Sequence, residues 1–204
     1  MSRTAFRREF ALSLALAVGV GAAAPLLTPL GAQQAPPTVL RVEPSGRATT
    51  QVTVTTRGPE GTEPSPLSVT IDYGQPHARG RQIVGNLIPY DQVWRTGANE
   101  ATAFSTDVDL ELGGARVPRG RYTLYSLLTR SGWKLIVNRQ TGQWGTQYDP
   151  SRDLVRVELA TRELSVPQES FTMTLVPSIE APLRGELVLS WGTLQGRVPW
   201  RVLP

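Results

Sequence analysis

The sequence predicts an all-β protein, a single antiparallel β-sandwich of the jelly-roll or immunoglobulin-like (Ig-like) kind, with one long ordered loop and little helix. Three observations predict this class. Apolar and polar residues alternate over short runs along most of the chain, as in strands with one buried face. Glycine-containing turns separate several of these runs. No long segment has the apolar spacing of an amphipathic helix, so the crossover helices of a parallel sheet are missing.

Residues 1–32 are expected to form a secretory signal peptide. Arginines precede an apolar run from Phe10 to Ala24, which is shorter than the roughly 20 residues of a transmembrane helix. We expect cleavage near residue 23 or 32, and Arg7-Arg8 before Phe10 resembles a twin-arginine signal. An uncleaved anchor is the alternative. The mature protein is thus expected in the periplasm or outside the cell, with no stable membrane anchor.

Residues 33–48 are expected to hold a linker and the first strand, and residues 49–204 the β-domain. Strands are predicted at 49–56, 67–73, 121–128, 133–139, 154–161, 170–176, 185–192 and 197–203. Turns are predicted at Gly113-Gly114, Ser131-Gly132 and Leu194-Gln195-Gly196, the last of which would separate the final two strands. Residues 58–66 are rich in proline and glycine and are predicted to form a flexible connection.

Residues 74–99 interrupt the alternation. Structureless connections of this length inside a domain are usually functional or disordered, and the apolar residues of this one favour an ordered segment, with one helical turn near residues 91–95. Ordering costs about 1–2 kcal/mol per residue. We therefore expect Arg95, Asn99 and Glu100 to be buried in a polar network that latches the segment, and Arg95→Ala to destabilise by about 2–4 kcal/mol. The alternative is that the same residues, with Trp94, form a ligand site.

Three stretches carry a resemblance to a known family. They are YGQPHARGRQIVGNLIPYDQVWRTGANEAT, VPRGRYTLYSL and WKLIVNRQTGQWG. Together they resemble a bacterial exported family catalogued as domain of unknown function 2911 (DUF2911), over Leu67 to Val202, and the string VWRTGANE is the most specific part. The resemblance implies a single all-β domain behind a signal peptide. It assigns no activity, cofactor or site residue.

His77 is the only histidine and a weak candidate for acid/base chemistry. It would act as a general base if Asp72, Asp91 or Glu100 lay beside it. An ordinary turn histidine is the simpler interpretation.

Other residues are candidates for binding. Arg79 and Arg81 can present two guanidinium groups to an anion, although pairing with the carboxylates of Asp72, Asp91 or Glu100 is the simpler expectation. Trp144 lies in a glycine-flanked loop and is the best candidate for an exposed stacking surface. The other tryptophans outside the long segment, at 133, 191 and 200, are expected in the core.

Composition excludes several kinds of function. With no cysteine and one histidine, neither a thiol nucleophile nor a histidine-rich metal site is expected, and no cofactor is implied. Without its leader the chain has 18 basic and 16 acidic residues, scattered along the sequence, so no nucleic-acid partner is expected. Asp107, Asp109 and Glu111 are spaced by two and are expected on a solvated strand face rather than at a calcium ion.

The leading functional hypothesis is a non-catalytic binding module for a small polar or glycan-like ligand, or for an envelope partner. Its candidate ligand-binding residues are Arg79, Arg81, Trp94, Arg95, Asn99, Glu100 and Trp144. A hydrolase-like acid/base enzyme that uses His77 with a nearby carboxylate is the alternative, and a structural envelope protein is the third.

The leader gives a first prediction. Because the apolar run is short and follows a basic start, the exported protein is expected to lack it. N-terminal sequencing of protein from the native host should begin near Ala24 or Gln33. An intact Met1 on the exported protein would contradict this prediction.

Overall fold

The computed structural model describes residues 44–55, 58 and 65–204. This part of the chain is all-β, as predicted, and its helical structure is a single 3-10 turn, Pro150–Arg152. The expected signal peptide, residues 33–43 of the linker and most of the 58–66 connection lie outside the described residues. Within the described ranges, no helix is long and apolar enough to cross a membrane.

The strands form one antiparallel sheet. They are β1 (Arg47–Thr55), β2 (Pro66–Gly74), β3 (Val93–Trp94), β4 (Thr102–Thr106), β5 (Leu110–Leu112), β6 (Ala115–Val117), β7 (Gly120–Leu128), β8 (Trp133–Asn138), β9 (Asp153–Pro177) and β10 (Arg184–Val202). Their order is β1-β2-β4-β7-β8-β9-β10-β5-β6, and β3 pairs with β7. Because the sheet is continuous, its division into the two sheets of a jelly-roll or Ig-like sandwich is not confirmed.

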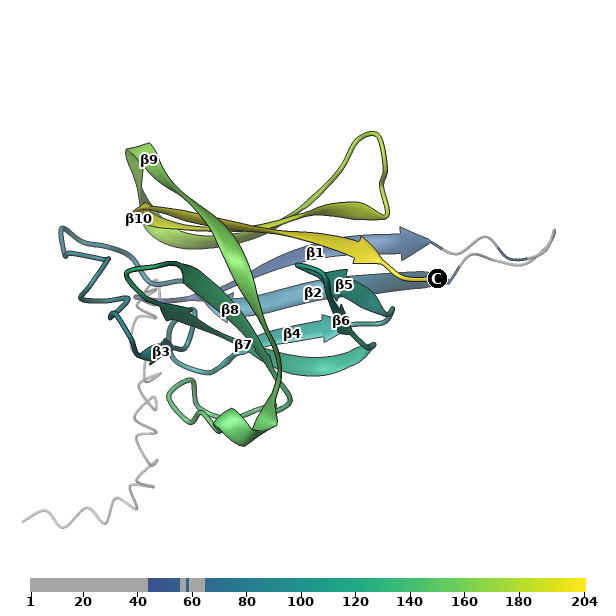
Figure 1. Ribbon diagram of the computed structural model, residues 1–204, viewed down its shortest axis with the longest axis horizontal. Coiled ribbons are helices and arrows are strands. Elements are labelled where there is room, and N and C mark those ends of the chain that lie inside the picture. The colour runs from purple at the N-terminus through teal and green to yellow at the C-terminus, as the bar shows by residue number, and fades with distance from the viewer. Residues whose placement is uncertain (1–43, 56–57, 59–64) are drawn as a thin grey trace, which may run out of the picture. The chain divides into compact units, whose positions relative to one another are not determined.

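The two longest strands each unite segments that the sequence predicted as separate. β10 continues through Leu194-Gln195-Gly196, which pairs with β9, so the turn predicted there is wrong. The register shifts on either side of Gly192 bend the pair without ending it. The first part of β9 pairs with β8 and the rest with β10, and Figure 1 shows β9 rising past β8 to the level of β10. The other two predicted turns, at Gly113-Gly114 and Ser131-Gly132, do separate paired strands.

The core lies on the inner face of this bent sheet. The Trp94 ring lies 5.1 Å from Phe171 and 5.7 Å from Trp191, between ring centroids. Trp133, Trp191 and Trp200 are buried, as predicted. Each large apolar side chain that is removed from water contributes about 1.5–3 kcal/mol, so these contacts join the β9–β10 part of the sheet to the rest.

The long segment is ordered, but without the predicted helical turn. Val93 and Trp94 instead form β3, which pairs with Leu127 and Ser126 of β7. The two ends of the segment touch, because the Ala98 N–H donates to the Gly74 carbonyl at 3.1 Å. A Cβ atom on Gly74 would lie 2.0 Å from the Ala98 carbonyl oxygen. Glycine is therefore required where the segment leaves β2.

One edge of β9 faces away from β10 and is closed by groups from elsewhere in the chain. Alternate backbone N–H groups between Phe171 and Leu175 point to this edge. They donate, in order, to the Pro76 carbonyl at 2.9 Å and to the hydroxyls of Tyr73 and Thr50, each at 3.0 Å. Two of the three acceptors are side chains of β1 and β2. The N-terminal strands thus satisfy an edge to which they are not paired in the sheet.

Removal of one acceptor tests this closure. Tyr73 is buried, and Tyr73→Phe leaves the Met173 N–H without its partner. The free energy of unfolding should fall by about 1–3 kcal/mol, because a buried donor is left unpaired. Urea melts measure the change. Tyr90→Phe is the control, since the hydroxyl of Tyr90 makes no hydrogen bond among the described residues, and equal stability of the two variants would contradict the prediction.

Candidate functional site

The expected latch of Arg95, Asn99 and Glu100 is wrong. Asn99 and Glu100 are exposed, because left-handed backbone at Thr96 (φ 52°) and Asn99 (φ 62°) turns the chain. Thr96 is fully buried instead, and the Thr102 hydroxyl donates to its carbonyl at 2.8 Å. Two threonines therefore hold the end of the segment.

Arg95 is half-buried and has neither a hydrogen bond nor an ion pair from its side chain within the described part of the chain. Its stem packs on Gly145, where a Cβ atom would lie 2.8 Å from the Arg95 Cδ. The guanidinium group is thus free, and the large cost expected for Arg95→Ala loses its basis. Trp94, by contrast, is in the core at 8% exposure and offers no surface for stacking.

Residues 139–149, which we call the 139–149 loop, lie against residues 99–101. The Gly145 N–H donates to the Asn99 carbonyl at 3.1 Å, and Glu100 forms a bridge with Trp144. Trp144 is 47% exposed, as expected. The structure therefore brings together four predicted ligand-binding residues from two distant parts of the sequence: Arg95, Asn99, Glu100 and Trp144.

The predicted acid/base residues are not brought together. His77 Nδ1 lies 2.8 Å from the Ser170 hydroxyl, and none of the described carboxylates makes a hydrogen bond or ion pair with His77. Asp72 forms an ion pair with Arg47, and Glu100 lies 3.7 Å from the same guanidinium group. The sequence analysis did not consider Arg47 as their partner. Asp91, the third carboxylate, is exposed in a left-handed turn.

Arg79 and Arg81 do not form the ion pairs that we expected as the simpler outcome. The Arg81 guanidinium donates to the carbonyls of His77 at 2.7 Å and Ala78 at 3.0 Å, and Arg79 donates to the Pro44 carbonyl at 3.2 Å. Arg81 lines an open hollow of about 620 Å³ beside Glu169. A Glu169 carboxylate oxygen already accepts from the Arg79 N–H at 2.8 Å. The charged groups around this hollow are therefore largely engaged within the protein.

A smaller cavity, of about 340 Å³, lies over β4 and β7 and is bordered by the 139–149 loop. We call it the β4–β7 cavity. Apolar side chains contribute to its lining, and its polar lining residues are Glu100, Ser105, Arg121, Thr123, Thr141 and Gln143. It joins the face of the sheet to the loop that carries Trp144.

Gln143 holds an acceptor that has no donor. The Thr123 hydroxyl donates to the Gln140 carbonyl at 2.8 Å, and the Tyr125 hydroxyl donates to the Gln147 carbonyl at 2.9 Å. Both hydroxyl hydrogens are thus committed, so both oxygens accept from Gln143 Nε2, at 3.1 and 3.0 Å. This fixes the orientation of the amide. Its Oε1 atom is buried and has no hydrogen-bond partner among the described residues.

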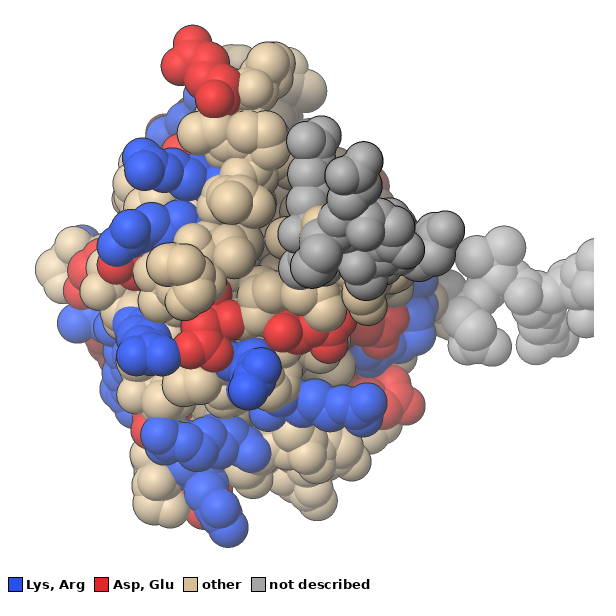
Figure 2. Space-filling view, turned by 90° about the vertical axis from the view of Figure 1, so that its right-hand side faces the viewer, with Lys and Arg blue, Asp and Glu red and all other residues tan. Residues whose placement is uncertain are grey.

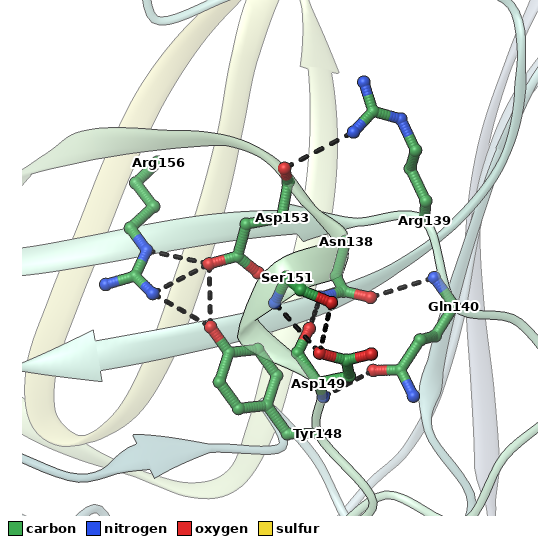
Figure 3. Close-up of polar contacts among 8 residues, drawn as sticks. All are labelled: Asn138, Arg139, Gln140, Tyr148, Asp149, Ser151, Asp153 and Arg156. Atoms are coloured by element: carbon green, nitrogen blue, oxygen red, sulfur yellow. Dashed lines mark hydrogen bonds and ion pairs between the residues drawn. The ribbon is translucent and has the colours of Figure 1, made fainter.

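A buried asparagine holds the end of the 139–149 loop. Asn138 is fully buried, and its amide nitrogen donates to the Asp149 carbonyl at 2.9 Å and to an Asp153 carboxylate oxygen at 2.8 Å. Its carbonyl oxygen accepts from the Gln140 N–H at 2.8 Å. Figure 3 shows these contacts converging on the loop from the end of β8 and the start of β9. Both N–H groups of the Asn138 amide and one of the two lone pairs of its oxygen are thereby used.

Tyr148 extends this network to the surface. Its hydroxyl donates to the Asp153 carboxylate at 2.7 Å, and Arg156 contacts both groups (Figure 3). Burial, the hydrogen bond to Asp153 and the negative charge of Asp153 together raise the pKa of Tyr148 to about 12, against a smaller opposing effect of Arg156. Tyr148 therefore remains a neutral donor at all physiological pH values.

A solvated strand face shared by Asp107, Asp109 and Glu111 was predicted from the sequence. This prediction is wrong. Asp107 accepts from the Ser68 N–H at 2.8 Å, and Glu111 pairs with Arg201 at 2.8 Å. These bonds lower the pKa of both carboxyl groups, and bonds from the Arg119 N–H and from Arg116 do the same for Asp109. Each carboxylate thus holds a different turn or strand. Within the described ranges, no group of three or more potential ligands surrounds a metal position.

The raised pKa of Tyr148 gives a prediction for stability at high pH. The folded protein holds this proton up to a pH of about 12, whereas an unfolded tyrosine loses it at about 10. The contribution is therefore complete below pH 10 and is lost as the pH rises towards 12. Urea melts across this range should show a shallower fall for Tyr148→Phe than for the wild type.

Asp153→Asn provides a second arm of this test, because it removes the charge that helps to raise the pKa of Tyr148. The fall in stability should then end at a lower pH than in the wild type. Some decline remains in Tyr148→Phe, since burial also raises the pKa of Tyr122 and Tyr125. Parallel curves for the wild type and Tyr148→Phe would show that the network does not hold the proton.

Five polar residues of the β4–β7 cavity were not predicted from the sequence: Ser105, Arg121, Thr123, Thr141 and Gln143. Gln143 directly precedes Trp144, and the glycine-flanked loop of Trp144 was predicted to be exposed, so the sequence did point to this loop. Arg121 and Thr123 lie two residues apart in a predicted strand, which places them on one face. Nothing in the sequence shows that this face borders the 139–149 loop.

Comparison with known proteins gives one family. No curated protein and no solved structure matches the chain. The family model described as "Protein of unknown function (DUF2911)" matches residues 60–200, which agrees with the resemblance seen in the sequence and covers more than half of the chain. The chain therefore belongs to the DUF2911 family of proteins of unknown function.

Proposed function

We propose that this protein is a non-catalytic binding module that takes a small polar, glycan-like ligand in the β4–β7 cavity. The observation that carries the proposal is the Gln143 Oε1 atom, a buried acceptor without a donor on a residue that lines the cavity. Leaving such an acceptor unpaired costs about 1–3 kcal/mol. A ligand hydroxyl or amide that reached this atom would recover that free energy, which favours ligands rich in donors.

The lining and the rim suit a sugar-like molecule. The volume of about 340 Å³ lies in the range of small-molecule sites, about 300–1,000 Å³. Ser105 and Thr141 supply hydroxyl groups that make no hydrogen bond within the described part of the chain. Trp144 is 47% exposed, follows the lining residue Gln143 and forms a bridge with the lining residue Glu100. Polar groups around an aromatic surface match the two sides of a sugar ring.

Hydrogen bonds within the chain hold the site in place. Asn138, Tyr148 and Asp153 fix the end of the loop, and the hydroxyls of Thr123 and Tyr125 fix the Gln143 amide. A loop that is ordered before binding loses little entropy when the ligand arrives. This supports a binding role more than a role in which the loop only covers the sheet.

The geometry favours binding over the hydrolase-like alternative. His77 has a serine hydroxyl as its partner and no carboxylate among the described residues, and it lies outside the residues that line the β4–β7 cavity. Export of the protein, if the leader acts as expected, would place the cavity in the periplasm or outside the cell. A polar ligand from that environment, rather than an envelope partner, fits a cavity of this size.

The test is to fill the cavity without disturbing the core. Ala103 lines the cavity and is exposed on β4, so Ala103→Phe should occupy the site while the fold is kept. Saturation-transfer NMR against a panel of neutral sugars and small amides should detect binding to the wild type. The affinity for the same compounds should fall at least about tenfold in Ala103→Phe.

Ala160→Phe is the matched control, because Ala160 is also exposed on a strand and lines none of the cavities described above. It should bind as the wild type does. Iodide quenching of tryptophan fluorescence gives a second readout of ligand binding. It reports on Trp144, since the other four tryptophans are at most 8% exposed. Equal binding by the two phenylalanine variants would refute the proposed site.

A further inference from the structure

We propose that the ligand of the β4–β7 cavity is an acidic oligosaccharide, with its carboxylate at the Arg121 end and its hydroxyl groups towards Gln143 and Glu100. This inference rests on the proposed function and names the ligand class of the same site. It is carried by the juxtaposition, in one cavity, of an arginine without a partner and a buried acceptor without a donor.

Arg121 is a free cation in the lining. It is exposed and makes no ion pair or hydrogen bond from its side chain among the described residues. The positive charge of Arg121 helps to lower the pKa of Asp107, but the Asp107 carboxylate accepts its hydrogen bonds from the N–H and hydroxyl of Ser68, at 2.8 and 2.9 Å. A planar guanidinium with free N–H groups binds a carboxylate in a bidentate way.

A further arginine strengthens the positive charge at this end. Arg139 has no carboxylate partner for its side chain within the described ranges, where it donates to the Asp153 backbone carbonyl at 3.4 Å. Arg139 is close enough to Tyr122, a lining residue, for its positive charge to oppose the burial that raises the pKa of Tyr122. Figure 2 shows the end of the molecule where β4 stops and β7 begins, and basic side chains gather over its lower half, below a row of acidic ones.

The other end of the cavity has the opposite character. Glu100 lies just before the start of β4, whereas Arg121 pairs with Ser105 near the end of β4. Five residues separate these points, or roughly 16 Å at about 3.3 Å per residue. The Gln143 amide lies between them, because its Nε2 atom donates to the Thr123 hydroxyl at 3.1 Å. The Glu100 carboxylate offers only acceptors. The cavity thus recognises an elongated ligand with an anion at one end and hydroxyl donors at the other.

The charge of the ligand is tested with two probes of the same shape. Aldotriouronic acid is a trisaccharide with one carboxylate, on its terminal uronic acid ring, and its methyl ester has the same sugar rings without the charge. Isothermal titration calorimetry at low salt should show at least about tenfold tighter binding of the acid, and added salt should reduce this difference. Arg121→Gln should reduce the affinity for the acid to that for the ester.

Arg184→Gln is the matched control, because Arg184 is also exposed and lies outside the lining of the β4–β7 cavity. It should keep the preference for the acid. Equal affinities for acid and ester, equal effects of the two glutamine variants, or no binding of either trimer would each overturn the acidic class.

Ala103→Phe separates these failures from failure of the proposed function. If neutral compounds or the ester still bind and are lost in Ala103→Phe, the cavity is a ligand site and only the acidic class is wrong. If Ala103→Phe binds every probe as the wild type does, the site itself is wrong. A preference for the acid that disappears in both Arg121→Gln and Ala103→Phe, but not in Arg184→Gln, supports the inference.

Discussion

The fold depends on satisfying the free edge of β9. Backbone N–H groups that are buried without an acceptor cost as much as a lost hydrogen bond, and alternate amides between Phe171 and Leu175 face away from β10. The acceptors come from Thr50, Tyr73 and Pro76. This requirement draws β1, β2 and the start of the long segment to β9, and the same approach encloses the aromatic core around Trp94, so the hydrogen bonds and the apolar burial support each other.

The pairing of hydrogen-bond donors with acceptors also determines the arrangement of the candidate site. Where every group finds a partner, as around Asn138, the chain is held in one arrangement. Where the hydroxyl hydrogens already donate elsewhere, as in Thr123 and Tyr125, the Gln143 oxygen is left without a donor among the described residues. The unpaired acceptor is thus a product of the well-paired network next to it, and its position is fixed by the buried residues Thr123 and Tyr125.

The strands could be predicted from the sequence because alternation reports one buried face, and the exposure of Trp144 could be predicted from its flanking glycines. The continuity of β10 through Leu194-Gln195-Gly196 could not, since a glycine that bends a strand at a bulge has the same local signature as one that ends it. The exposure of Asn99 and the role of Gln143 depend on left-handed residues and on strand register. Both are set by tertiary contacts, which alternation along the chain does not encode.

The pairing of β10 with β5 has a consequence for the order of folding. Trp200, Arg201 and Val202 pair with residues 110–112, so the β5–β6 hairpin has no neighbour in the sheet until the last strand has been synthesised. Contacts of such large sequence separation form slowly, because a long loop must close before they contribute. A chain that is still emerging would therefore hold the β5–β6 hairpin as an unpaired edge. Such edges favour association with other chains. Because β5 and β6 are short, only a short unpaired edge is exposed before β10 has been synthesised.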